Sequence, residues 1–286
     1  MSQCKWLTLA TIVLFCFCGS AQSGLIPYYN EVMADNPLVY YQFDEAVGAT
    51  TAVNYGTASS ADGTFYNLTL GQTSAFAGLG VCGAYNGIWG TDGSTLIIPS
   101  GVTAMNVGTG DFSIELWYYA ANDDRHDLFA NKDNSATVKS FALINDWPSA
   151  VDTVCAYETG GTVHNTKPSA ENEAWHHLMV TRTSGTYAMY IDTTKTAITG
   201  SSVLDFTADK WSGQKTIGSN FAGSSGHDTT QTLNGFLDEF AFYGTALTQE
   251  RINAHYAAAQ VPEPSTAALL TCGLLGLLAY AWRKRK

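Results

Sequence analysis

Basic residues are scarce in this chain of 286 residues. Lys and Arg number 14 against 25 Asp and Glu, and the formal net charge is −11. Four of the basic residues are the last four of the chain, 283–286, so the part before them is more acidic still. An acidic surface repels phosphate backbones, which excludes nucleic acid as a partner.

Glycine, proline and internal repeats are too few for a fibrous or low-complexity protein. The chain has 27 Gly and 7 Pro, and no repeat of fixed period is visible. Hydrophobic residues make up 45% of the sequence, which is enough for a packed core and excludes a disordered acidic chain. We therefore expect one folded region with processing signals at its ends.

The first 21 residues have the pattern of a secretory signal peptide. Lys5 gives a basic start, an apolar run covers 7–18, and the small residues 19–21 suit cleavage. The mature protein is expected to begin at Gln22, with a lead-in over 22–35 before the folded domain.

The C-terminus combines three features in a fixed order. A linker at 259–266 contains Pro262, Glu263 and Pro264, an apolar run of 16 residues covers 267–282, and the basic tail 283–286 follows. As a helix the run covers roughly 24 Å, and flanking side chains extend its reach toward a bilayer core of about 30 Å. We expect a transmembrane helix with its basic tail in the cytoplasm and the preceding domain outside.

This order resembles the PEP-CTERM sorting signal of Gram-negative bacteria. The resemblance implies that an exosortase-type processing enzyme recognises Pro262-Glu263-Pro264, removes the helix and passes the protein on. The protein is then expected at the cell surface, in the outer envelope or outside the cell, after transient anchoring in the inner membrane. The alternative is a permanent C-terminal anchor helix.

Cysteine is rare in the region between these signals. Only Cys82 and Cys155 lie there, and two cysteines alone provide no zinc site. In an oxidising compartment they are candidates for one disulfide, and two buried thiols are the alternative.

Short alternating apolar runs predict an all-β sandwich in the middle of the chain, because helical periodicity is nearly absent there. Twelve strands suit one two-sheet domain over 36–258. The predicted strands are 38–43, 63–70, 81–86, 95–99, 112–119, 127–131, 140–145, 153–158, 175–183, 186–192, 215–219 and 233–243.

Two local patterns are specific. A two-residue turn at 184–185 predicts a hairpin whose register pairs Arg182 with Tyr187, Val180 with Met189 and Leu178 with Ile191. The last two pairs are expected to face the core, and the opposite face, which begins at Trp175, is partly covered or faces a ligand. Thr248 is the expected N-cap of a helix over 249–259.

Four segments in sequence resemble the laminin-G-like jelly-roll family, which is related to concanavalin A lectins and pentraxins. They are 40–45, 111–117, 175–192 with its Trp-His-His hairpin, and the closing strand 235–243 with Asp238-Glu239. The resemblance implies a concanavalin A-like jelly roll over nearly the whole exported region. Asp238 and Glu239 are expected to support packing between the terminal strands, and a structural calcium shared with Glu45 is the alternative.

The sequence lacks the carboxylate run that retaining glycosidases of this fold place on one strand. Glu171-Asn172-Glu173 is the nearest approach and is expected to be a solvated loop, and no Gly-x-Ser-x-Gly elbow is present. His176 and His177 point to opposite faces of a strand, so one ion cannot take both. We therefore expect no enzymatic activity, with a glycoside hydrolase as the alternative.

Calcium is the expected ion if one is bound, because an exported acidic domain offers hard oxygen ligands. The family resemblance implies a site at Asp92, and a second acidic cluster contains Asp123, Asp124 and Asp127. Solvated turns are the alternative for both.

Aromatic side chains in polar loops are candidates for stacking on sugar rings. Trp89, Trp147 and Trp211 stand in or beside such loops. Together with the family resemblance, they predict a surface binding or adhesion module for a polysaccharide or matrix component. A purely structural matrix protein is a further alternative.

Overall fold

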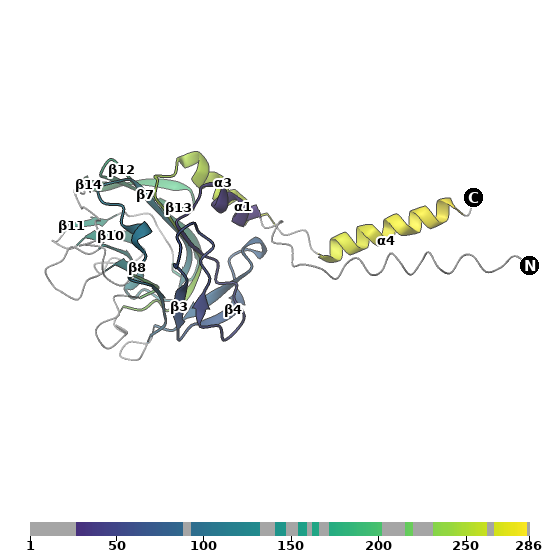
Figure 1. Cartoon of the computed structure of the whole chain (residues 1–286), viewed down its shortest axis with the longest axis horizontal. Helices are drawn as coiled ribbons and strands as arrows, with labels where there is room; N and C mark the ends of the chain where they lie inside the picture. Colours follow the sequence, from purple (N-terminus) through teal and green to yellow (C-terminus); the bar gives the residue numbers. More distant parts are fainter. Residues whose placement is uncertain are drawn as a thin grey trace, which may run out of the picture.

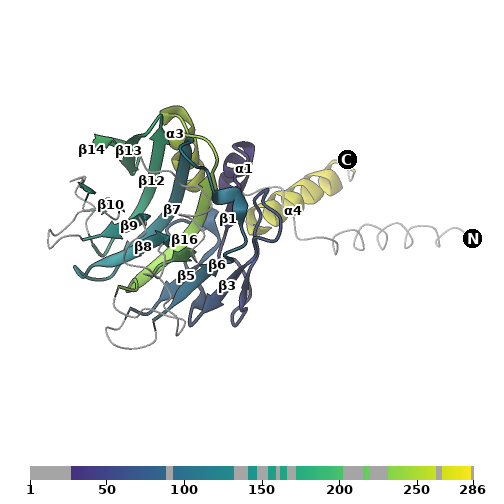
Figure 2. The same ribbon diagram turned by 60° about the vertical axis from the view of Figure 1, so that its left-hand side comes forward.

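The protein is a sandwich of two antiparallel sheets, with helices on the outer face of one sheet (Figures 1 and 2). The computed structural model describes residues 27–87, 93–131, 141–146, 154–158, 162–165, 172–201, 215–219, 231–261 and 266–284. The predicted signal peptide 1–21 lies outside these residues. The all-β architecture is confirmed.

We call the two sheets sheet A and sheet B, and the described residues form eight strands in each. Sheet A consists, in spatial order, of β14 (Thr194–Ser201), β13 (Thr186–Ile191), β12 (Trp175–Thr183), β7 (Phe112–Ala120), β16 (Gly235–Tyr243), β5 (Val81–Tyr85) and β4 (Thr69–Thr73), with β1 (Val39–Tyr41) beside β16. Sheet B consists of β11 (Thr162–Asn165), β10 (Val154–Glu158), β9 (Phe141–Asn145), β8 (His126–Asn131), β15 (Lys215–Ile217), β6 (Thr95–Ile98), β3 (Gly63–Tyr66) and β2 (Thr51–Ala52).

The main core lies between the sheets and follows the alternation of each strand. On β7, Phe112, Ile114, Leu116 and Tyr118 are buried in this core, while the residues between them face outward. Phe112 stacks on Phe242 of β16 with ring centroids 5.8 Å apart. Such interdigitated rings fill the space between aligned sheets.

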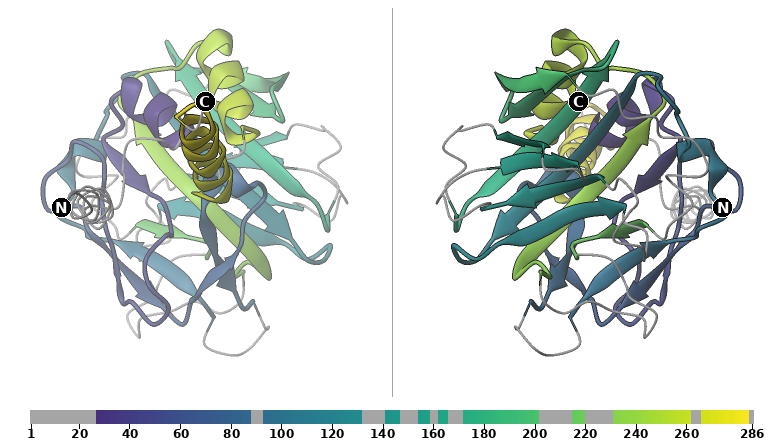
Figure 3. Two further views of the ribbon diagram at one scale, coloured as in Figure 1. Left: turned by 90° about the vertical axis from the view of Figure 1, so that its right-hand side faces the viewer. Right: turned by 90° about the vertical axis from the view of Figure 1, so that its left-hand side faces the viewer.

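A second core lies between the outer face of sheet A and two helices, α1 (Pro27–Ala34) and α3 (Gln249–Ala259). In Figure 3 both helices lie together on one side of the sandwich. The predicted helix over 249–259 is confirmed with its cap, because Thr248 Oγ1 accepts a hydrogen bond from the Arg251 backbone N–H at 3.4 Å. Ile252 and His255 are fully buried on its inner face. The second core therefore depends on α3, a helix that the local sequence predicts.

The hairpin between β12 and β13 has the predicted register. Leu178 pairs with Ile191, Val180 with Met189, and the strands turn at Ser184 and Gly185. Both turn residues have positive φ angles, 49° and 79°, as a tight two-residue hairpin requires. The opposite face of the hairpin is partly covered by the second core, which was one of the two alternatives.

The structure differs from the prediction around residue 67. The predicted strand 63–70 is two strands, since β3 belongs to sheet B and β4 to sheet A. Asn67 between them has a φ of 51°, which turns the chain from one sheet into the other. β4 is an edge strand, and its pairing with β5 is irregular between Thr69 and Gln72, where Gly71 has a φ of 80°.

Several of the described elements were not predicted. Helix α1 lies in the expected lead-in and packs against α3, and strands β2, β11 and β14 extend the sheets. Two short 3₁₀ helices, η1 (Ala77–Leu79) and η2 (Thr103–Met105), were not predicted either.

The C-terminal apolar run forms α4 (Thr266–Arg283), of 18 residues, drawn apart from the sandwich in Figure 1. Its described large side chains are exposed, among them Leu275 and Trp282. The helix is confirmed, but among the described residues no helix has the length and apolar character needed to cross a membrane. The transmembrane span stays a prediction.

A substitution at Gly218 tests the packing at the end of β15. Its φ is 78°, and a Cβ there would lie 2.1 Å from Cε1 of the buried Tyr85 ring. Gly218→Ala should lower the free energy of unfolding by about 2–4 kcal/mol, because it adds backbone strain and displaces that ring. Urea denaturation measures the loss. Gly101→Ala is the control, since nothing lies within 4 Å of its Cβ, and equal stability of the two variants would contradict the packing argument.

Candidate functional site

Several predicted site residues lie outside the described residues, and the structure says nothing of them. They are the loop aromatics Trp89, Trp147 and Trp211, the aspartate Asp92, and the sorting residues Pro262, Glu263 and Pro264.

The second predicted calcium cluster is held by side-chain amides. Asp123 and Asp124 are exposed before β8 and accept hydrogen bonds at 2.8 Å from Asn172 and Asn122, whereas Asp127 is fully buried on β8. Within the described ranges, no group of three or more His, Cys, Asp or Glu side chains is placed to hold a metal. Calcium binding by these residues stays a prediction.

Cys82 is a free, buried thiol on β5. Its Sγ lies 3.4 Å from the Thr73 carbonyl oxygen, and burial raises the pKa of the thiol. Cys155 belongs to β10 in the other sheet. For Cys82 the structure thus contains the second alternative, a buried thiol, and the candidate disulfide is not formed.

The Trp-His-His segment of β12 sends its histidines to opposite faces, as predicted. His176 Nδ1 lies 2.7 Å from Asp192 Oδ2, while His177 Nε2 lies 2.7 Å from Glu115 Oε1 beneath the helices. The two rings therefore serve separate contacts and cannot hold one ion together.

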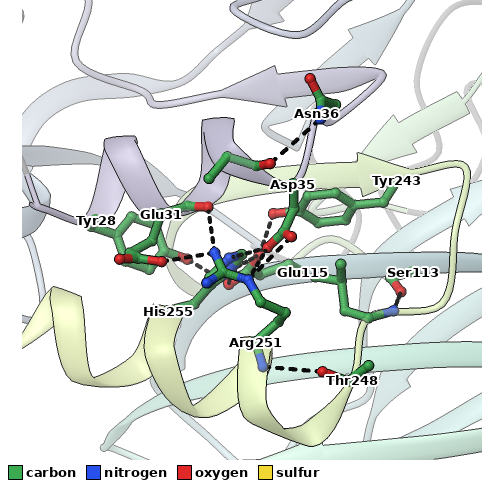
Figure 4. A network of polar contacts seen from close by, with 12 residues as sticks. Tyr28, Glu31, Asp35, Asn36, Ser113, Glu115, Tyr243, Thr248, Arg251 and His255 are labelled. Atoms are coloured by element: carbon green, nitrogen blue, oxygen red, sulfur yellow. Dashed lines mark hydrogen bonds and ion pairs between the residues drawn. The ribbon is translucent and has the colours of Figure 1, made fainter.

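Glu115, in the middle of β7, is the centre of a buried polar network (Figure 4). Its side chain is fully buried, and both carboxylate oxygens have partners. The Tyr28 hydroxyl of α1 donates to Oε1 at 2.9 Å, and the Tyr243 hydroxyl of β16 donates to Oε2 at 2.6 Å. His177 and His255 supply the remaining contacts, so four elements meet at one carboxylate.

The network continues from Glu115 to the surface through α3. His255 Nδ1 lies 3.0 Å from both Glu115 oxygens, and His255 Nε2 lies 2.8 Å from Asp35 Oδ2. Asp35 follows α1 and also accepts from Arg251 Nε at 2.8 Å, while Arg251 reaches Glu31 at 2.7 Å. These contacts tie α1 to α3 and both helices to the sheet.

Electrostatics keep this network charged. Burial would raise the pKa of Glu115, but the charge of His255 and hydrogen bonds from His177 and His255 hold it well below its ordinary value. Burial would lower the pKa of His255, and the charges of Glu115 and Asp35 raise it instead. Removing one partner of a buried ion pair typically costs about 3–5 kcal/mol, so the network fixes the helices in place.

Two further carboxyls are buried beside this network without a cation. Asp238 and Glu239 are consecutive on β16 at an irregularity in its pairing with β7. The Ser74 hydroxyl donates to Asp238, and the Tyr40 hydroxyl donates to Glu239. Within the part of the chain that the structure describes, Asp238 Oδ1 and Glu239 Oε1 have no hydrogen-bond partner. Their expected role in packing at the terminal strands, with a calcium shared with Glu45 as the alternative, stays a prediction.

Burial raises the pKa of both carboxyls. The charge of Asp44 adds to the shift at Asp238, and the charge of Asp238 adds to that at Glu239. Within the described residues, no basic side chain forms an ion pair with either. Two such neighbours favour protonation of at least one carboxyl at neutral pH.

The outer face of sheet A also has an open aromatic surface beyond the helices. Trp175, Tyr119 and Phe236 occupy directly opposed positions on β12, β7 and β16, so they share this face. Their ring centroids are 5.5–6.1 Å apart, and all three side chains are partly exposed. We call these three residues the aromatic cluster.

The part of the sheet face that α3 covers ends next to the aromatic cluster. Trp117, two residues before Tyr119 on β7, is buried under Tyr256 of α3, with ring centroids 5.6 Å apart, and under Phe76. Sequence reasoning placed Trp175 in a family motif and on a face that is partly covered or faces a ligand, and in the structure Trp175 also packs against the second core. The strand alternation that placed it on a mixed face was the signal that could have found the cluster.

Replacing a buried uncompensated carboxyl tests the electrostatics of Asp238 and Glu239. Folding raises the pKa of the Glu239 carboxyl, so the folded state binds its proton more tightly than the unfolded state does. The free energy of unfolding of the wild type should therefore fall as the pH rises from about 4.5 toward the folded-state pKa. Glu239→Gln keeps an acceptor for Tyr40 and should raise the free energy of unfolding at pH 7 by about 1–3 kcal/mol.

Urea denaturation between pH 4 and 8 measures this effect, and the gain should vanish near pH 4. The exposed Glu173→Gln is the control and should change stability by less than about 0.5 kcal/mol. A loss of stability in Glu239→Gln at every pH would mean that the carboxylate is ionised and held by a cation.

Solved structures of several proteins share this fold. Domain 4 of AbnA, a GH43 extracellular arabinanase from Geobacillus stearothermophilus solved with arabinotriose, is similar with a TM-score of 0.54 and 20% identity, over 79% of this chain and 98% of that one. A Trypanosoma rangeli sialidase solved with sialic acid has a TM-score of 0.52 and 11% identity, over 77% of this chain and 32% of that one.

The receptor binding domain of botulinum neurotoxin D has a TM-score of 0.51 and 12% identity, over 78% of this chain and 52% of that one. The chain thus spans about half of the neurotoxin domain and a third of the sialidase, and these identities show the fold alone. No curated protein sequence matches the chain.

Two family models match the sequence. The PEP-CTERM protein-sorting motif matches residues 260–286, directly after α3, and indicates an exported protein. The model of the concanavalin A-like lectin/glucanases superfamily matches residues 90–253, more than half of the chain. The chain belongs to the concanavalin A-like lectin/glucanases superfamily.

Proposed function

We propose that this protein is an exported surface module that binds a neutral polysaccharide through the aromatic cluster. The observation that carries the proposal is the open position of Trp175, Tyr119 and Phe236 at the end of a sheet face whose other end is covered. In Figure 2, β16 extends from near the helices toward the opposite end of the sandwich, and Phe236 belongs to the first residues of this strand, which begins at Gly235.

The chemistry of the cluster favours a sugar ring as its ligand. Aromatic faces bind the apolar faces of pyranose and furanose rings, and nearby polar groups orient the hydroxyls. On the next strand, β5, the residue paired with Phe236 is Ala84. Its small side chain leaves the aromatic rings accessible. The acidic balance of the chain disfavours anionic ligands, so a neutral glycan fits best.

Two of the similar solved proteins support a carbohydrate ligand. Domain 4 of the arabinanase was solved with arabinotriose and the sialidase with sialic acid. The sorting motif supports display outside the cytoplasm, with an exosortase-type enzyme as the processing partner and transient membrane anchoring before cleavage.

We also propose that the module is not an enzyme. Glycoside hydrolysis needs two carboxyls facing a cleft that admits the substrate. Glu115, Asp238 and Glu239 are fully buried, and the Glu115 oxygens are saturated by protein donors. None of these three groups is placed to reach a glycosidic bond.

A glycan array followed by titration calorimetry with the best polysaccharide tests the binding proposal. Trp175→Ala and Phe236→Ala should each weaken binding about tenfold or more, because each removes a stacking face worth about 1.5 kcal/mol. Melting temperatures of the variants show whether they are folded.

Tyr55→Ala is the matched control. Tyr55 is 41% exposed and contacts Tyr29 and Tyr40 rather than the cluster, so its removal should leave the affinity unchanged. Equal affinity in all three variants would overturn the assignment of the site. No binding on the array together with self-association would favour a structural matrix protein. Release of reducing sugar from a glycan would favour a glycoside hydrolase.

A further inference from the structure

His255 is placed between two carboxylates, and this geometry sets its protonation. Its Nδ1 lies 3.0 Å from the Glu115 oxygens and its Nε2 lies 2.8 Å from Asp35 Oδ2. A neutral imidazole has only one N–H and presents a lone pair at its other nitrogen. Both contacts are hydrogen bonds only when both nitrogens carry protons, so the closed arrangement requires the imidazolium cation.

Among the other groups around the ring, His177 of β12 contacts Glu115 through Nε2, and its buried Nδ1 has no hydrogen-bond partner among the described residues. The charge of His177 acts less strongly on Glu115 than that of His255. Tyr28 of α1 and Tyr243 of β16 are neutral donors to Glu115, and burial followed by the charge of Glu115 raises the pKa of each.

On the outer side of the ring, Arg251 of α3 and Glu31 of α1 belong to the same network. Arg251 binds both Asp35 and Glu31 and is partly exposed. It therefore offsets the charge of Asp35 from the solvent side, while His255 provides the larger of the two histidine charges that act on the fully buried Glu115. Glu239 is the remaining acid on the sheet that acts on Tyr28 and Tyr243.

We propose that His255 is a pH-dependent latch, which holds α1 and α3 on sheet A while both ring nitrogens are protonated and releases them when one proton is lost. Loss of that proton turns a lone pair toward a carboxylate and takes the larger of its two histidine counter-charges from the buried Glu115. A buried charge without a partner is strongly unfavourable, and the strain is relieved when the helices move away and water enters.

The direction of the pH effect follows from linkage. The pKa of His255 in the closed state lies above its ordinary value of 6.5, so the latch is complete below pH 6.5 and is lost as the pH rises through the closed-state pKa. The pKa of Glu115 is lowered, so its contribution is present above about 4.5 and is lost only when the pH falls through its closed-state value. The cover is therefore tightest in mildly acidic solution.

Release of α3 changes the mechanical link to the sorting motif. The matched motif begins at residue 260, one residue after α3 ends. In the closed state the backbone of Val261 lies against η1, since a Cβ on Gly78 would meet the Val261 carbonyl oxygen at 2.6 Å. When the latch opens, the attachment point moves back to the start of α3, and the 11 residues of that helix join the tether.

Two measurements on the full chain test the latch. Imidazole ¹⁵N resonances report whether both nitrogens of His255 carry protons, and amide hydrogen exchange gives protection factors for α1 and α3 relative to the central strand β7. We expect a doubly protonated ring at pH 6.5. Above this pH, protection of the helices should fall about tenfold per pH unit until the ring has titrated, while protection of β7 stays constant.

His255→Gln removes the titrating charge and should make helix protection independent of pH between 6 and 9. His176→Gln is the matched control, because His176 contacts Asp192 on the other face of β12 and should leave the profile unchanged. A neutral His255 ring at pH 6.5, or constant helix protection while the wild-type ring titrates, would overturn the proposal. The wild-type measurements decide the question even if His255→Gln does not fold.

Discussion

The carboxylate of Glu115 carries a negative charge into a part of the protein that water does not reach. Such a charge is tolerated only when protein groups replace its hydration, and here tyrosines and histidines from α1, β12, β16 and α3 do so. The two helices therefore have one place on the sheet at which every polar atom of Glu115 is satisfied. Apolar contacts of the second core add area, but the carboxylate selects the docking position.

This constraint divides the outer face of sheet A into two regions. At one end, Trp117 and Met179 are sealed under the helices and belong to the second core. At the other end, the rings of the aromatic cluster keep a face toward solvent. The strands β12, β7 and β16 thus carry both the buried network around Glu115 and the partly exposed aromatic cluster. The region covered by the helices ends between the two.

Much of the fold could be predicted from local patterns. The turn at Ser184 and Gly185 sets the register of β12 and β13 because a two-residue loop leaves no freedom, and Thr248 caps α3 because its hydroxyl serves the first turn. The break at Asn67 has no such signal, since the alternation runs through it without glycine or proline.

The network was harder to foresee because its partners are distant in sequence. Helix α1 contains little helical patterning and is held by Arg251, 220 residues away from Glu31. Glu115 looked like one residue of a family strand, and only the tertiary structure brings His255 to it. The aromatic cluster was missed for a different reason. Trp175 and Phe236 belong to recurrent motifs, and motif membership says nothing of which face of a sheet stays open.

The irregular edge strand β4 has a consequence for how copies of an exported protein meet. Its ladder is broken between Thr69 and Gln72, and Gly71 bends the strand. A bent edge does not present the straight row of backbone donors and acceptors that a strand of another molecule needs for pairing. Another copy of the protein therefore pairs poorly with β4. Copies can lie close together without forming a continuous intermolecular sheet at this strand.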